Sequence, residues 1–116
     1  MMEFADNKPI YLQVTDFCRR QILDGKWVTH GRIPSTKELA VELAVNHRTV
    51  MKAYDDMNSA GVVYQKRGLG YFVAPDAIEA IHRQMRAEFM ATTLPDFLAA
   101  MRMAGLTPAD VIPLIR

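Results

Sequence analysis

The stretch from Gly31 to Val73 constrains the fold more than any other part of the chain, because it carries start and stop signals for several short elements in close succession. Its segment Ser35–Glu38 matches the S-x-x-E capping box, in which the serine oxygen accepts a helix N-terminal amide and the glutamate bonds back to the cap. The pattern predicts a helix that begins at Thr36. Its buried side would consist of Leu39, Ala40 and Leu43.

A second helix is predicted directly after the first, from about His47 to Ser59. Asparagine is a good N-cap residue, so Asn46 marks its start after a short turn at Ala44 and Val45. Apolar residues recur at i, i+3, i+4 and i+7 and define a core face: Val50, Ala53, Tyr54 and Met57. The opposite face, left for solvent or a ligand, carries Arg48, Met51, Lys52 and Asp55.

A β-hairpin is predicted after this helix. Val62–Gln65 is rich in β-branched and aromatic residues, as strands are, and Tyr71–Val73 would be the returning strand. The connecting Lys66–Gly70 contains two glycines and reads as a turn. The predicted fold is therefore mainly α with a small β-hairpin: a winged helix-turn-helix followed by a short helical tail.

The part before Gly31 is predicted to hold one helix, from Pro9 to Asp24, with Ile10, Val14, Phe17 and Cys18 on one face. Lys26–Pro34 is expected to be a connecting loop from which Trp27 and Val28 pack inward. Cys18 is the one cysteine of the sequence, so it is expected to be a buried free thiol.

Composition limits what the chain can do. With 116 residues, half of them hydrophobic, it can build one modest core and a small appendage. The formal charge of +1 excludes a surface that is basic on all sides, so nucleic-acid binding requires basic residues gathered on one face. No segment approaches the ~18 apolar residues of a membrane span, and the N-terminus lacks the apolar core of a leader, so we expect a cytoplasmic protein.

Catalysis is not indicated by any residue pattern. We find no nucleophile with its base, no phosphate-binding loop and no cluster of metal ligands, and His30, His47 and His82 lie far apart in the sequence. We therefore expect neither an enzyme nor a cofactor or bound metal.

DNA binding is the function that the helix pair favours. In a helix-turn-helix only the first turn of the second helix reaches base edges in the major groove. The residues in that place are Asn46, His47, Arg48 and Thr49. Arg48 is suited to guanine or to a phosphate, and Lys52, one turn further on, to the DNA backbone.

Phosphate contacts are expected from two other places. A helix N-terminus favours anions, and the first helix adds hydroxyls and a charge there, from Ser35, Thr36 and Lys37. The hairpin tip can approach DNA closely because it combines basic side chains with glycines, at Lys66, Arg67, Gly68 and Gly70. Such contacts position the protein without reading sequence.

Each of these features has an ordinary structural explanation on its own: a helix cap, a solvated face or a common turn. Their order and spacing favour DNA binding. The alternative is a winged-helix protein-interaction module without DNA binding, in which Arg48, Lys52 and Arg67 serve a protein partner.

Five separated blocks together resemble the GntR family of bacterial transcriptional regulators: P-I-Y-L-Q (9–13), D-G (24–25), G-R-I-P-S-T-K-E-L-A (31–40), V-N-H-R-T-V-x-K-A-Y (45–54) and R-G-x-G-x-F-V (67–73). The resemblance implies a winged helix-turn-helix, over 9–74, that binds double-stranded operator DNA as a homodimer. It implies DNA contacts at positions 35–37, 47–49, 67, 68 and 70.

Three positions depart from the family pattern. Lys37 replaces a usual arginine, which keeps the charge but loses the bidentate fork. Leu69 stands where a basic wing-tip residue is frequent, and Tyr71 stands for a common threonine. The minor-groove contact that the resemblance implies for this wing is therefore expected to be weaker.

The remaining segment, 76–116, is too short to enclose a ligand pocket and resembles the short dimerisation tail of the YtrA-like subfamily. A helix of about four turns is expected, with an apolar stripe of Ile78, Ile81, Met85 and Phe89, followed by two short helices from Leu94–Pro95 and Thr107–Pro108. The stripe would pack across a two-fold axis and suit a pseudo-palindromic operator, as expected of a repressor. Alternatively, it folds back onto its own winged helix. The methionines of the tail could form an adaptable surface for an unidentified small-molecule effector.

Overall fold

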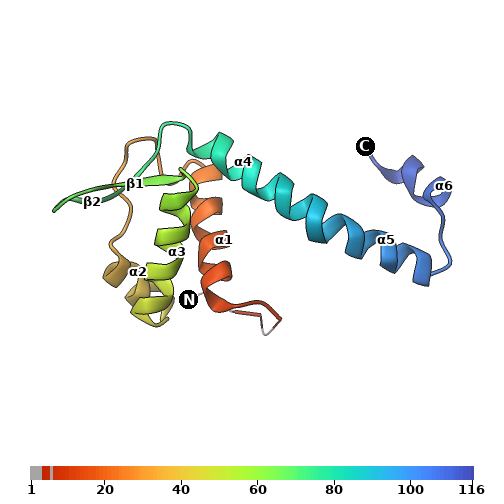
Figure 1. The fold of residues 1–116 in the computed structure, drawn as a ribbon, viewed down its shortest axis with the longest axis horizontal. Coiled ribbons are helices and arrows are strands. Elements are labelled where there is room, and N and C mark those ends of the chain that lie inside the picture. The colour runs from red at the N-terminus through yellow and green to blue at the C-terminus, as the bar shows by residue number, and fades with distance from the viewer. Residues whose placement is uncertain (1–3, 6) are drawn as a thin grey trace. The chain divides into compact units, whose positions relative to one another are not determined.

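The computed structural model describes Phe4, Ala5 and residues 7–116, and it divides into two compact units, Met1–His82 and Arg83–Arg116. The elements are shown in Figure 1: α1 (Ile10–Leu23), α2 (Thr36–Leu43), α3 (His47–Ser59), β1 (Val63–Lys66), β2 (Gly70–Val73), α4 (Ala77–Glu88), the π-helical turn η1 (Phe89–Thr93), α5 (Leu94–Met103), α6 (Pro108–Val111) and the 3-10 turn η2 (Ile112–Leu114). The predicted class, mainly helical with a small hairpin, is confirmed.

The two central helices begin where their caps predict. The Ser35 hydroxyl accepts the Glu38 N–H at 3.1 Å, and the Glu38 carboxylate accepts the Ser35 N–H at 2.8 Å, which completes the capping box of α2. Ala44 then turns the chain in the left-handed conformation (φ 57°). Asn46 caps α3, so α2 and α3 are joined by only a few residues.

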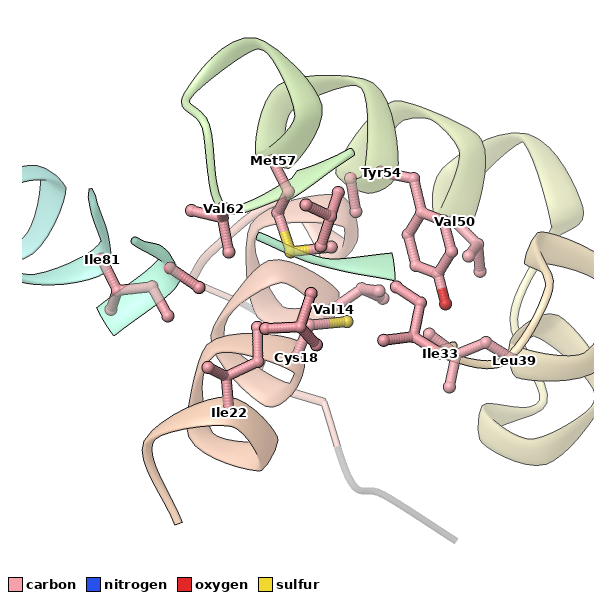
Figure 2. Packing of buried hydrophobic residues seen from close by; sticks show 14 of the residues in the cluster. Val14, Cys18, Ile22, Ile33, Leu39, Val50, Tyr54, Met57, Val62 and Ile81 are labelled. Atoms are coloured by element: carbon pink, nitrogen blue, oxygen red, sulfur yellow. The ribbon is translucent and has the colours of Figure 1, made fainter. Parts of the chain in front are cut away.

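The core of the first unit lies between α1 and α3 (Figure 2). Val14, Cys18 and Ile22 of α1 face this core, and Tyr54 and Met57 of α3 pack into it. Cys18 is fully buried, and burial raises the pKa of its thiol far above the ordinary value. The predicted core face of α3 is confirmed, which fixes the opposite face of α3 toward solvent. The face predicted for α1 is confirmed in part: Val14 and Cys18 are buried, Phe17 is partly buried, and Ile10, in the first turn, is 38% exposed.

The hairpin pairs β1 with β2 in antiparallel register, with Val63 opposite Val73 and Lys66 opposite Gly70. A third extended segment joins it: His30 N–H donates to the Val73 carbonyl at 2.8 Å, and Ile33 N–H to the Tyr71 carbonyl at 3.0 Å. The loop predicted over Lys26–Pro34 is confirmed, and near its C-terminal end it pairs with β2 through one isolated bridge, Arg32 with Phe72. Backbone pairing with a distant strand leaves no mark in local sequence.

The inward packing expected of Trp27 and Val28 is only half confirmed. Trp27 is partly buried and meets Phe17 edge to face, with ring centroids 6.3 Å apart. Val28 is instead 60% exposed. Its place in a turn, where the Gly31 N–H donates to the Val28 carbonyl, keeps the side chain out of the core.

The first turns of α4 belong to the core of the winged helix. Ala77, Ala80 and Ile81 are buried there, and Figure 2 shows Ile81 among the side chains of the same buried cluster as Val62. This corrects the sequence interpretation of Ile81 as a residue of an exposed dimerisation stripe. Ile78 is half exposed, so one side of α4 packs inward while another side stays in solvent.

The second unit continues α4 without the break predicted before Leu94. The π-helical turn η1 leads directly into α5, and Pro95 lies in the first turn of α5. Proline has no N–H to donate to the preceding turn, and a locally widened π turn accommodates that loss without ending the helical path. Gly105, with φ 75°, follows α5, and the Thr107 N–H donates to the Asp110 carboxylate at 2.9 Å.

Large apolar side chains of this unit lie exposed along the helical run: Met85, Phe89, Met90, Phe97 and Met103. Among the described residues, no single helix is long and apolar enough to cross a membrane, and a bent pair, Ala77–Met103 with Pro108–Leu114, reaches that length and composition only when counted jointly.

Candidate nucleic-acid interface

The first turn of α3 presents polar groups to solvent. The Asn46 carboxamide oxygen accepts the Arg48 N–H at 2.8 Å, which satisfies one of the free amides at the helix start. Arg48 is exposed and Thr49 is partly exposed. Since Val50 and Tyr54 on the inner side are completely buried, the helix cannot rotate, and its outward side chains have a fixed direction.

The start of α2 presents a second polar surface. The Ser35 hydroxyl oxygen accepts the Glu38 N–H, and the hydroxyl also hydrogen-bonds with the Glu38 carboxylate. The Ser35 N–H and hydroxyl at the Glu38 carboxylate hold the pKa of that carboxyl below its usual value. Lys37 is exposed beside them. This helix start can thus hold an anion through amides, a hydroxyl and an ammonium group.

A hydrogen bond between side chains joins the two helix starts. The Thr36 hydroxyl and Nε2 of His47 lie 2.7 Å apart, although they come from different helices. If Nε2 donates, the Thr36 hydroxyl proton is free for a phosphate; if Nε2 accepts, that proton is used internally. One ring nitrogen of His47 therefore couples α2 to α3, and Nδ1 takes no part in that hydrogen bond.

Lys52 is held over an aromatic ring of α1. Its Nζ lies 4.4 Å from the centroid of the Tyr11 ring, a distance at which a cation is attracted by the ring face. The contact directs the exposed ammonium group of α3 and ties that helix to α1. Sequence reasoning missed Tyr11, although it lies in the first of the family-like blocks.

The hairpin tip is a tight turn with two basic residues, Lys66 at the end of β1 and Arg67 in the turn itself. The Leu69 N–H donates to the Lys66 carbonyl at 2.9 Å, and Gly68, with φ 78°, takes the left-handed position that glycine fills at little cost. Arg67 and Leu69 are both exposed. Lys66 lies with its Nζ 5.1 Å from the Phe72 ring centroid.

Arg32 connects this tip to α2, and sequence reasoning missed it as well. Its Nε–H donates to the Leu69 carbonyl at 3.2 Å, and its Nη2 lies 3.8 Å from the Glu38 carboxylate. The signal was present, because Arg32 stands within the family-like block 31–40, but that position was interpreted as loop.

The structure thus brings the predicted contacts to three places on one unit: the start of α2 (Ser35, Thr36, Lys37), the first two turns of α3 (Asn46, His47, Arg48, Thr49, Lys52) and the wing (Lys66, Arg67, Gly68, Gly70). Across the described part of the chain, no group of three or more His, Cys, Asp or Glu side chains could hold a metal ion. Fold and surface together define a winged helix-turn-helix protein.

The family assignment agrees with this class. Residues 10–73 match the model of the bacterial regulatory proteins of the gntR family, which covers more than half of the chain. The chain belongs to the GntR family of transcriptional regulators.

Two relatives show how much of the chain is shared. It is 29% identical over 110 residues to the uncharacterized HTH-type transcriptional regulator YhcF of Bacillus subtilis (strain 168), a match that spans 95% of this chain and 89% of YhcF. It is 35% identical over 66 residues to the histidine utilization repressor of Pseudomonas putida, covering 57% of this chain but only 27% of that repressor.

The solved structures likewise match either nearly the whole chain or mainly its winged helix. A chain from Bacteroides thetaiotaomicron assigned to the GntR family of transcriptional regulators is 35% identical, with a TM-score of 0.76 over 91% of this chain and 92% of that one. AraR(DBD) in complex with operator ORR3 is 32% identical, with a TM-score of 0.57 over 64% of this chain and 89% of that one. The winged-helix fold is therefore shared with a protein that has been seen on operator DNA.

Proposed function

We propose that this GntR-family regulator is a cytoplasmic repressor that binds a pseudo-palindromic operator as a homodimer. The observation that carries the proposal is the Thr36–His47 hydrogen bond, which holds the starts of α2 and α3 together with polar groups on both. One helix start suits the phosphate backbone, and the other fits the major groove. The likeness to AraR(DBD) with operator ORR3 supports this use of the surface.

The two groups of contacts have different roles in this proposal. Ser35, Thr36 and Lys37 grip phosphate and set the position of the protein. His47, Arg48 and Thr49 reach base edges, with Arg48 suited to guanine through its planar guanidinium. The proposal of repression rests on the relatives, since the histidine utilization repressor shares the winged helix.

The proposal of a homodimer rests on the exposed apolar side chains of the helical tail. Ile78, Met85, Phe89 and Phe97 are each between 41% and 50% exposed, and a helical surface with such residues suits a second copy of the chain. Two copies related by a two-fold axis would read half-sites about 34 Å apart.

Salt dependence tests DNA binding directly. Five exposed basic residues at the predicted surface, Lys37, Arg48, Lys52, Lys66 and Arg67, would release counterions from the duplex. We expect the logarithm of the association constant to fall with log salt at a slope of about −4 or steeper for each half-site. The measurement is fluorescence anisotropy on duplexes selected from a random pool, and the selected sites should form an inverted repeat.

A protein-interaction module would behave differently. It would select no common sequence from the pool, and its affinity for duplexes would show no preference over random DNA. That result would contradict the repressor proposal and favour a protein partner for Arg48, Lys52 and Arg67.

Charge introduced on the tail tests the homodimer. Phe89→Glu is expected to convert the dimer to monomer and to weaken binding to the full inverted repeat at least tenfold, because burying an unpaired carboxylate at an interface is costly. Sedimentation velocity over a range of protein concentrations measures the change. Val41→Glu, at an 83% exposed site of α2, is the control for added charge. A Phe89→Glu protein that still sediments as a dimer would contradict the assigned interface.

A further inference from the structure

Arg32 is attached to the wing through both its backbone and its side chain. Its backbone forms an isolated antiparallel bridge with Phe72 of β2, which fixes the position of its Cα beside the hairpin. From there the Nε–H reaches the Leu69 carbonyl at the tip, 3.2 Å away. A charged donor to a carbonyl makes a stronger hydrogen bond than a neutral one.

Gly70 provides the space for this contact. A Cβ built on Gly70 would lie 3.2 Å from Nε of Arg32, which is tighter than nine in ten real Cβ contacts, so Arg32 would have to shift by a few tenths of an ångström. Gly70 also has φ 112°, a conformation that other residues rarely adopt. The guanidinium group thus lies directly against the wing backbone, on the side where a side chain is missing.

The far end of the guanidinium group points to α2. Nη2 of Arg32 lies 3.8 Å from the Glu38 carboxylate, which is itself fixed by the capping box. Both side chains are more than half exposed, so this ion pair contributes little to the stability of the fold. Its effect is on geometry, because it connects the wing tip to the start of α2.

We propose that Arg32 is a positioning residue for DNA binding: it holds the wing turn at a fixed place relative to the start of α2, so that Arg67 meets DNA when α3 occupies the major groove. This inference rests on the proposed function. It also accounts for the apolar tip, because the guanidinium group under the Leu69 carbonyl supplies positive charge where the side chain of residue 69 supplies none.

Hydrogen exchange in the free protein tests, without DNA, whether Arg32 holds the wing turn in place. In Arg32→Met we expect the Leu69 amide, which closes the turn on the Lys66 carbonyl, to exchange about tenfold faster, while core amides of α3 stay unchanged. The control is Arg20→Met, which removes the same charge at an exposed site of α1. Arg20 lies about 13 Å along the helix from Tyr11, the residue that contacts Lys52. An unchanged exchange rate of the Leu69 amide would contradict the claim that Arg32 holds the wing turn in place.

A double-mutant cycle on the full-length protein and a selected operator duplex tests the positioning role. Arg32→Met and Arg67→Met should each weaken binding about tenfold, and the double variant should be little weaker than either one, because Arg32 acts through Arg67. Arg32→Lys keeps the charge but lacks the planar fork, so it should not restore the contribution of Arg67. Losses that multiply would overturn the role, because Arg32 would then act as an independent phosphate contact.

The two measurements separate this inference from the proposed function. If the unmodified protein binds no duplex, the proposed function and the positioning role both fail, and the exchange rates still decide whether Arg32 braces the turn. If the unmodified protein binds its operator and the cycle is additive, only the positioning role fails.

Discussion

Replacing Ile81 with alanine is expected to lower the free energy of unfolding by about 2–5 kcal/mol, although a helical stripe in the sequence places this residue among exposed ones. The structure buries Ile81 completely, within the same cluster as Val62 and Ile22. Truncation removes apolar burial and leaves a cavity that the surrounding helices fill only in part. Urea denaturation followed by circular dichroism measures the loss.

Ile78 is the matched control for that experiment, because it is the same residue type on the same helix and is 50% exposed. Ile78→Ala should leave the intrinsic stability within about 0.5 kcal/mol of the original. Any loss it causes should shrink on dilution, since it would come from weaker association of two copies, which contributes least when both proteins are monomeric. Equal losses for the two variants at every concentration would contradict the placement of α4 in the core.

Arg48→Ala is expected to weaken binding to the preferred operator by about 1–3 kcal/mol and to relax the preference at one base pair, provided that Arg48 pairs with guanine. The expectation follows from the exposed position of Arg48 in the first turn of α3, whose rotation is fixed by buried Val50 and Tyr54. Anisotropy titrations against the operator and against each single base-pair variant measure both effects.

Lys52→Ala is the comparison that separates base reading from phosphate contact. Loss of a phosphate contact weakens binding to all sequences alike and reduces the salt slope by about one, whereas the base preference stays. An Arg48→Ala protein with unchanged affinity for its preferred operator would refute the assignment of α3 as the recognition helix.

The helices of the winged unit were predictable because their signals are local. The box from Ser35 to Glu38 and the cap at Asn46 specify where α2 and α3 begin through hydrogen bonds within a few residues. The period of Val50, Tyr54 and Met57 specifies the buried face of α3, and with it the outward direction of Arg48. Most of the candidate DNA surface follows from these local patterns.

The remaining features depend on partners far away in the sequence. Arg32 reaches Leu69, His47 meets Thr36, and Lys52 lies over Tyr11, and in each pair the contact exists only after the elements have packed. Ile81 illustrates the same limit, because periodicity identifies an apolar stripe but not which apolar surface covers it. The sequence therefore predicts which side chains face outward better than it predicts which of them hold one another.

Cys18 makes the folded state of this protein measurable without any label. Its thiol is fully buried in the core of the winged unit, and burial raises its pKa, so that a soluble disulfide reagent meets neither an accessible sulfur nor a reactive thiolate. Because the sequence contains one cysteine, the rate of modification counts openings of this core alone. The modification rate of Cys18 therefore reports how often this core opens. In dilute solution the same rate should be faster in Ile81→Ala, whose core is packed less tightly.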